Sequence, residues 1–117
     1  MQFTSSSITE LDQASTDERD AASFGIIGFG SDKVVDRYNA TESRMAGLSP
    51  EKVVGKHFFD VVAPCMNNFM VAQRFDDELS LDEVIDYVLT LRMRPTPVKM
   101  RLLKSPTLDR RYILVQR

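Results

Sequence analysis

Cys65 is the only cysteine of the 117-residue chain, and it follows Ala63 and Pro64 in the apolar stretch VVAPCMNN. A thiolate is a nucleophile and a metal ligand, but one thiol forms no internal disulfide and supplies only one ligand to a zinc site. The single histidine, His57, could in principle meet Cys65 as a nucleophile pair. A lone histidine beside Lys56 is more typical of a solvated surface. Taken alone, Cys65 is therefore best interpreted as a small buried hydrophobic side chain.

The composition is that of one globular domain, with 43% hydrophobic and 27% charged residues. A net charge of −2 gives no electrostatic reason to expect nucleic acid or an anionic membrane as a partner. The N-terminus lacks the pattern of a signal peptide, and no apolar run is long enough to cross a bilayer. We therefore expect a cytoplasmic protein that binds neither nucleic acid nor membrane and holds no metal.

The composition of the chain changes at Phe24, from mainly polar residues to an apolar run. Residues 1–21 are polar and small, which predicts a helical or loosely attached N-terminal segment. The apolar run FGIIGF and the run VVDRY are separated by GSDK, which has turn chemistry. This pattern predicts a β-hairpin.

Two short helices are predicted in the middle of the chain. Asn39 is a preferred N-cap residue, Glu42 three residues later completes a capping box, and Gly47 suits the end of that helix. Ser49 and Pro50 then begin a second helix. After it, the proline of APC prevents a regular helix from reaching the cysteine, which we expect on a half-buried loop.

In the last third of the chain, apolar and polar residues alternate as they do in β-strands. Residues 81–93 fit a helix or a strand, and a strand is favoured for their second half. VKMRLL and RYILVQ are two further strands around the turn KSPTLD. Two strands, a helical middle and three strands predict an antiparallel sheet with helices on one side. The solvent side of this sheet is expected to hold Arg92, Arg94, Arg101, Arg110 and Arg111.

The run YNATESRMAGLSPEKVVGKHFFDVVAPC resembles the photoactive yellow proteins, a family of the PAS superfamily. Its most specific element is the joint occurrence of YNA, a glutamate four residues after that tyrosine, GKxFF and APC. The resemblance covers most of residues 23–117, including LRMRPTPVKM. It implies an α+β, PAS-like fold with a central antiparallel five-stranded sheet, short helices on one side and an N-terminal helical cap. The expected division is a cap segment, 1–22, and a PAS-like domain, 23–117.

The resemblance also implies a covalent cofactor. In the family, the cysteine of APC carries a 4-hydroxycinnamoyl (p-coumaric acid) group as a thioester, and Cys65 occupies the matching position, preceded by Ala63 and Pro64. Met93 matches a methionine that the family uses to speed recovery in the dark. These residues are the expected cofactor-binding set, together with Tyr38 and Glu42.

Tyr38 and Glu42 match the residues that donate hydrogen bonds to the cofactor's phenolate in the family. A buried phenolate is costly unless donors satisfy it, and bonds to the charged form reverse the preference for the neutral one. Glu42 must be protonated to donate, which burial favours. Tyr38 just before the helix and Glu42 one turn into it can point into a common pocket.

The implied function is a blue-light photoreceptor and not an enzyme. Isomerisation of the cofactor would move a proton from Glu42 to the phenolate, and the charged carboxylate would favour local unfolding. The segment 1–21 would then act as the output element toward an unidentified downstream signalling protein.

The chain departs from the family pattern at several positions. Ala46 and Leu48 replace a threonine that bonds the tyrosine and an arginine that covers the pocket, and Ile26 replaces a small residue, which is expected to narrow the pocket. Leu89 and Leu91 replace an aromatic pair. These departures leave open a chromophore-free PAS-like domain for protein interaction or small-ligand sensing.

A third class of function is an enzyme or acyl-transfer protein that holds a thioester in passing on the Cys65 thiol. The sequence offers it no convincing base or oxyanion-hole motif.

Overall fold

The computed structural model describes residues 1–90 and 94–117. Met93 lies outside the described residues, as do Leu91 and Arg92.

Five strands form one antiparallel sheet in the order β2-β1-β5-β4-β3. They are β1 (Gly25–Phe29), β2 (Val35–Tyr38), β3 (Leu81–Leu89), β4 (Thr96–Lys104) and β5 (Arg111–Gln116). The predicted α+β architecture, with two strands, a helical middle and three strands, is confirmed. Strand β3 begins at Leu81, so the helical alternative for the first part of 81–93 is wrong. Pairing along its whole length with β4 outweighs the weak helical pattern.

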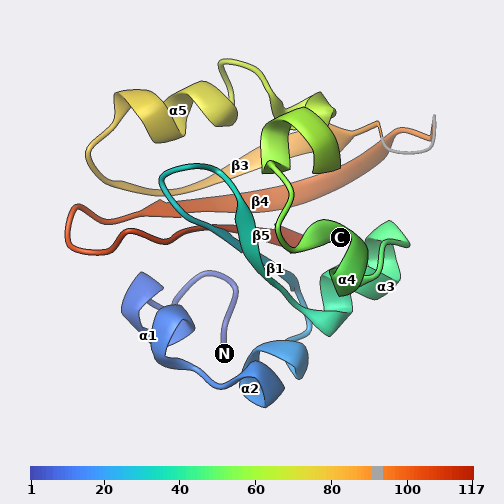
Figure 1. The fold of residues 1–117 in the computed structure, drawn as a ribbon, viewed down its shortest axis with the longest axis horizontal. Helices are drawn as coiled ribbons and strands as arrows, with labels where there is room; N and C mark the ends of the chain where they lie inside the picture. The colour runs from blue at the N-terminus through green and yellow to red at the C-terminus, as the bar shows by residue number, and fades with distance from the viewer. Residues whose placement is uncertain (91–93) are drawn as a thin grey trace.

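Short helices lie on both sides of the sheet (Figure 1). The N-terminal helices α1 and α2 lie on the opposite side of the sheet from α5 and the π-helix that precedes the cysteine turn (Figure 1). The helical elements are α1 (Ile8–Gln13), α2 (Thr16–Asp20), α3 (Ala40–Ala46), α4 (Pro50–Val53), the π-helix Phe58–Val62, a 3₁₀ turn Pro64–Met66, and α5 (Ala72–Asp77). None of the helices in the described part of the chain is long and apolar enough to span a membrane.

Each face of the sheet carries its own apolar cluster. The first cluster, which we call the main core, lies on the α5 side, where the ring of Phe29 contacts those of Phe58, Phe59 and Phe75. The second, the cap cluster, joins the N-terminal segment to the sheet and includes Leu11, which is fully buried. Residues 1–21 are therefore a docked helical cap, and the loosely attached alternative is wrong for this structure.

Arg101 corrects the prediction that the arginines of β4 and β5 face solvent. Its side chain is 4% exposed and donates to the backbone carbonyls of Phe3 and Ser6, at 3.0 and 2.7 Å. It also forms a bidentate ion pair with the carboxylate of Asp82 on β3. A guanidinium with five donors can satisfy such a set of acceptors at once. Arg94, by contrast, is exposed as predicted.

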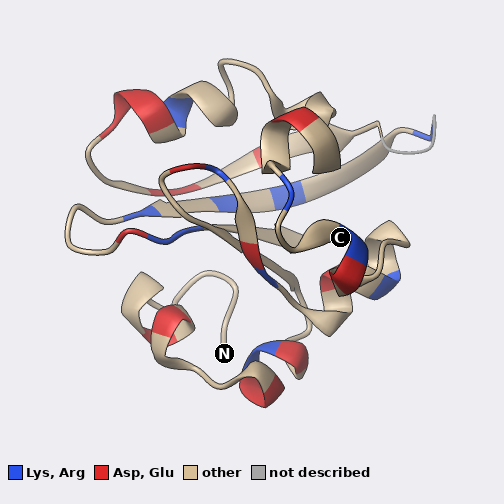
Figure 2. Ribbon diagram, in the orientation of Figure 1, with Lys and Arg blue, Asp and Glu red and all other residues tan. Residues whose placement is uncertain are grey.

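A second polar contact holds the cap through Asp12 at the end of α1. Its carboxylate accepts hydrogen bonds from Arg110 at 2.6 Å and from the hydroxyl of Tyr112 at 2.9 Å. Arg37 donates to the Asp12 carbonyl at 2.8 Å. Figure 2 shows acidic positions on α1 and α2 and basic positions on the strands of the sheet. The cap thus combines apolar burial with charge pairing.

Candidate functional site

Asn39 fixes the start of the helix that carries the candidate glutamate. Its Oδ1 accepts from the backbone N–H of Glu42 at 3.0 Å and of Ile26 at 2.9 Å, and its Nδ2 donates to two backbone carbonyls. The predicted N-cap is therefore present, whereas the predicted capping box is incomplete because the Glu42 side chain does not return to it. Gly47 ends α3 in the left-handed conformation, with φ of 73°.

The Glu42 carboxylate instead pairs with Arg117, which follows β5. The two bonds run from Nη1 to Oε1 at 2.8 Å and from Nη2 to Oε2 at 3.2 Å. The Glu42 side chain is 4% exposed and that of Arg117 is 14% exposed. A parallel fork of this kind is the strong form of an arginine–carboxylate contact.

Gly25 at the start of β1 makes room for this carboxylate. A Cβ on Gly25 would clash with Oε1 of Glu42 and approach its Cδ and Cβ at 3.0 and 3.1 Å. Any larger residue at position 25 would therefore displace the Glu42 side chain. The sheet and α3 meet closely at this point because β1 lacks a side chain there.

Tyr38, at the end of β2, is 8% exposed and belongs to the main core. Burial raises the pKa of its hydroxyl, the charge of Glu42 raises it further, and the charge of Arg117 opposes both. The Tyr38 hydroxyl therefore remains a donor at neutral pH. Burial also raises the pKa of Glu42, against the hydrogen bonds and charge of Arg117. Tyr38, Glu42 and Arg117 thus form one electrostatic group.

Cys65 lies on the 3₁₀ turn Pro64–Met66, partly buried and packed against the main core. Ala63 is buried in the same core, while Pro64 is exposed. The expected half-buried loop position of the cysteine is what the structure shows. The main core therefore contacts the cysteine turn and also contains Tyr38.

The backbone of Cys65 is held by two side chains that the sequence did not single out. Its carbonyl oxygen accepts from the Tyr87 hydroxyl at 2.7 Å and from Nδ2 of Asn68 at 3.1 Å. The same Asn68 nitrogen donates to the Tyr87 oxygen at 2.7 Å. In the sequence, Tyr87 is one of the alternating residues of 81–93, and Asn68 belongs to no motif.

His57 does not support a nucleophile pair with Cys65. Its side chain caps the π-helix, where Nδ1 accepts from the backbone N–H of Asp60 at 3.1 Å. The Asp60 carboxylate lies 3.6 Å from the same nitrogen. The described residues also contain no group of three or more potential metal ligands.

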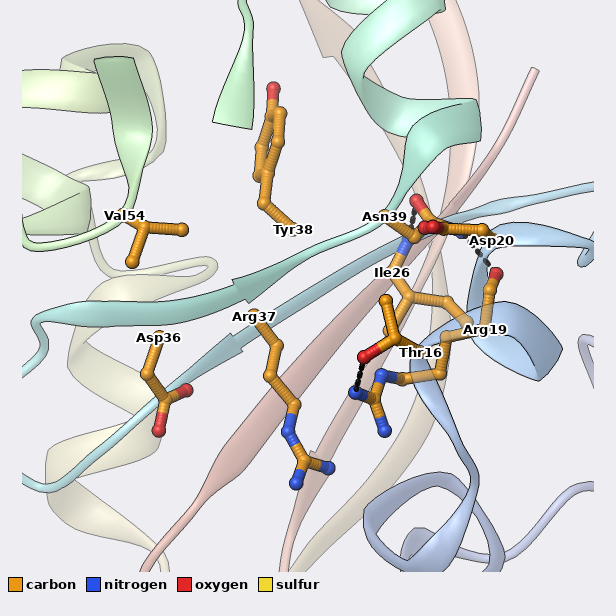
Figure 3. A pocket seen from close by; sticks show the side chains of 9 residues that line it. All are labelled: Thr16, Arg19, Asp20, Ile26, Asp36, Arg37, Tyr38, Asn39 and Val54. Atoms are coloured by element: carbon orange, nitrogen blue, oxygen red, sulfur yellow. Dashed lines mark hydrogen bonds between the residues drawn. The ribbon is translucent and has the colours of Figure 1, made fainter. Parts of the chain in front are cut away.

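Ile26 corrects the expectation of a narrowed pocket. Its side chain belongs to the cap cluster, not to the main core that contains Tyr38. Figure 3 shows Tyr38 and Ile26 pointing to opposite sides of the hairpin. Ile26 and Arg19 line a cleft of about 160 Å³ beside α2 and β2, to which Tyr38 also contributes. The larger residue in β1 therefore fills space under the cap.

Of the two other departures, Ala46 is buried on α3 and Leu48 packs against the main core. Neither side chain is a hydrogen-bond donor, so neither replaces the threonine or the arginine of the pattern. Leu89 is buried in the main core as well. Positions 46 and 48 are consequently more apolar than the family pattern implies.

Known proteins support the resemblance over nearly the whole chain, although no family model matches it. The chain is 32% identical over 115 residues to a photoactive yellow protein of Rhodothalassium salexigens, covering 92% of each. A crystal structure of the photoactive yellow protein domain from the sensor histidine kinase Ppr of Rhodospirillum centenum superposes with a TM-score of 0.85 at 38% identity. That match covers 93% of this chain and 98% of the domain.

The fold alone is shared more widely. A PAS domain of an HTR-like protein from Haloarcula marismortui superposes with a TM-score of 0.67 at 13% identity, covering 94% of this chain and 98% of that domain. The identity and coverage of the nearer relatives go well beyond likeness of fold. The chain has the PAS fold and belongs to the photoactive yellow protein family.

Proposed function

We propose that this PAS photosensor domain carries a 4-hydroxycinnamoyl group as a thioester on Cys65. The observation that carries the proposal is that the cysteine turn packs against the same apolar core that contains Tyr38. An aromatic group attached to the thiol would meet apolar walls and a buried phenol donor there. The Cys65 thiol loses its proton to solvent, and its sulfur forms a C–S bond with the acyl carbon of an activated ester or anhydride, whose leaving group departs with the electron pair.

When bound, the group supplies the absorption of light and a double bond that can isomerise. The residues of this chain supply the rest. Cys65 fixes one end, with Ala63 and Pro64 shaping its turn. Tyr38 donates a hydrogen bond to the phenol oxygen because its raised pKa keeps it protonated. Met93, outside the described residues, stays a predicted contact for recovery in the dark.

Glu42 is the proposed proton donor after illumination. Burial raises the pKa of its carboxyl against the opposing effect of Arg117, so a Glu42 that Arg117 has released can be protonated, hydrogen-bond a phenolate and later give up its proton to it. A carboxylate charged in this way is costly in an apolar site unless a cation meets it. Nothing in this step requires a metal or an enzymatic turnover, and we propose a sensor that is not an enzyme.

The N-terminal cap, residues 1–22, is the proposed output element of the domain formed by residues 23–117. Its two short helices depend on the sheet for their stability, because helices of this length are marginal in isolation. Local release of the cap would expose the cap cluster to a downstream signalling protein. The relative in Ppr belongs to a sensor histidine kinase, which suggests a partner of the signalling class. We propose that the protein is cytoplasmic. The Cys65 thiol would stay reduced there and remain able to form a thioester.

The test is the spectrum of the reconstituted protein in the dark and after illumination. The purified protein and its Cys65→Ala variant are incubated with activated 4-hydroxycinnamic acid and freed of excess reagent. We expect a new absorption band in the wild type alone, which changes on illumination and returns in the dark. A band of equal strength in Cys65→Ala, or a band that light does not change, would contradict the proposal.

A chromophore-free PAS-like domain is the second candidate, because Arg117 already occupies both oxygens of Glu42. Ala46 and Leu48 supply no hydrogen-bond donor at the positions of the family's threonine and arginine. In this case Cys65→Ala should leave partner or ligand binding and output unchanged. Loss of output in that variant would exclude this candidate.

A further inference from the structure

Arg117 is placed to control what Glu42 can do toward a phenol, and no resemblance of motifs pointed to it. Its guanidinium makes both of its bonds to the two oxygens of the Glu42 carboxylate. An arginine only donates, so Glu42 is the acceptor in both bonds. A carboxylate engaged in this way has no proton to give to a third group.

The pair is fixed from three sides. Gly25 leaves the space that the Glu42 side chain fills, since a Cβ there would clash with Oε1. The N-cap Asn39 holds the Glu42 backbone at the start of α3. Arg117 approaches from the end of β5, whose partner strand β1 pairs Gly25 with Val115. The ion pair therefore belongs to the folded scaffold and joins α3 to the sheet.

No other charged group of the described residues offers Glu42 an alternative partner. Tyr38 from β2 is the titratable neighbour whose electrostatics depend on both Glu42 and Arg117. Asp20 of α2 bonds the backbone N–H of Ala40 at 2.8 Å and so serves the helix start. Arg44 of α3 is exposed and lies near the hydroxyl of Thr41, at 3.4 Å. Arg117 is thus the cation that decides the charge of Glu42.

We propose that Arg117 competes with a bound phenolate for Glu42, and that the ion pair keeps the single shared proton on the phenol oxygen. Two arrangements of one proton are possible: a neutral phenol with an ionised Glu42, or a phenolate with a protonated Glu42. A cation in direct contact with the Glu42 oxygens stabilises the first arrangement more than the second, because it is closer to the carboxylate than to the phenol. The blue-absorbing phenolate form then requires Arg117 to release Glu42. This inference rests on the proposed function.

The first arm of the test needs no chromophore. The pKa of the Glu42 carboxyl is measured by ¹³C NMR in protein labelled at glutamate, with the signal assigned through Glu42→Gln. In Arg117→Gln, burial acts unopposed, and we expect the pKa of Glu42 to rise by about 1–3 units. Arg117→Lys keeps the charge but not the fork, so a smaller rise is expected. Arg44→Gln removes the same charge from an exposed position of α3 and should leave the pKa of Glu42 unchanged.

The second arm uses the Cys65 adduct at neutral pH. We expect the ratio of the phenolate band to the neutral phenol band to rise about tenfold or more in Arg117→Gln relative to wild type, and to stay unchanged in Arg44→Gln. An unchanged Glu42 pKa in Arg117→Gln, or an unchanged band ratio, would overturn the inference. If no variant forms an adduct, the proposed function fails, and the carboxyl titration alone decides whether Arg117 holds Glu42 ionised.

Discussion

The hydroxyl of Tyr87 donates a 2.7 Å hydrogen bond to the backbone carbonyl of Cys65. This bond ties the cysteine turn to β3 and leaves the thiol itself free of that contact. Asn68 bonds both groups and closes a small network around the turn. The position of the thiol is thereby set by residues that need not touch a bound chromophore.

Tyr87→Phe should loosen this turn without removing its apolar packing. Loss of one partly buried hydrogen bond is expected to cost about 1 kcal/mol in the free energy of unfolding. The Cys65 thiol should react faster with a small alkylating reagent, because the turn opens more often. Urea unfolding and the rate of thiol labelling measure the two effects. Equal labelling rates in variant and wild type would show that Tyr87 does not position the turn.

Gly25→Ala tests the close contact between β1 and Glu42. The added methyl group must displace the Glu42 carboxylate, and we expect a loss of about 1–3 kcal/mol in stability. Gly30→Ala is the matched control, because its nearest neighbours are the flexible carboxylates of Asp32 and Asp109 at 3.1 and 3.2 Å. In a double-mutant cycle with Glu42→Ala, most of the cost should disappear. A cost that persists without the Glu42 side chain would contradict this reading of the contact.

Arg101→Gln is expected to release the N-terminal cap while leaving the sheet folded. The carbonyls of Phe3 and Ser6 lose their donor, and each buried unsatisfied group costs about 1–3 kcal/mol. Hydrogen exchange should therefore accelerate in α1 and α2 and stay slow in β4 and β5. Lys99→Gln is the control on the same strand, because the Lys99–Asp86 pair is exposed and contributes little. Uniform acceleration over the whole chain would indicate global destabilisation instead.

The prediction of strands from alternation succeeded where alternate apolar side chains enter the same cluster, as in β4, where Val98, Met100 and Leu102 enter the main core. The same reasoning failed for Arg101, because a charged residue on the other face is buried by a segment 95 to 98 residues away in the chain. Arg117 was missed for a related reason: its partner Glu42 is 75 residues distant, and neither residue type marks the pairing. The matched positions 38, 42 and 65 came from the resemblance, not from periodicity.

Asp12 makes the attachment of the cap dependent on pH. Burial acts to raise the pKa of Asp12, but hydrogen bonds from Arg110 and Tyr112 and the charges of Arg110 and Arg37 outweigh it, so the pKa lies below its usual range. A lowered folded-state pKa contributes stability above the unfolded-state pKa, and this contribution is lost as the pH falls through the folded-state value.

The wild type should therefore exceed Asp12→Asn in unfolding free energy at neutral pH, and the difference should shrink in acid. Urea unfolding at a series of pH values measures this difference. Asp17→Asn, on α2, serves as the control for loss of an acidic residue from the cap. A difference between wild type and Asp12→Asn that stays constant down to strongly acidic pH would contradict the assignment.

The most direct test of the account is the intact mass of the protein after reaction with activated 4-hydroxycinnamic acid, followed by peptide mapping. We expect one added hydroxycinnamoyl group, located on the peptide that contains Cys65, removable by hydroxylamine as a thioester is, and absent from Cys65→Ser. An unmodified wild type, or a group attached at another residue, would contradict the central claim that Cys65 holds the chromophore.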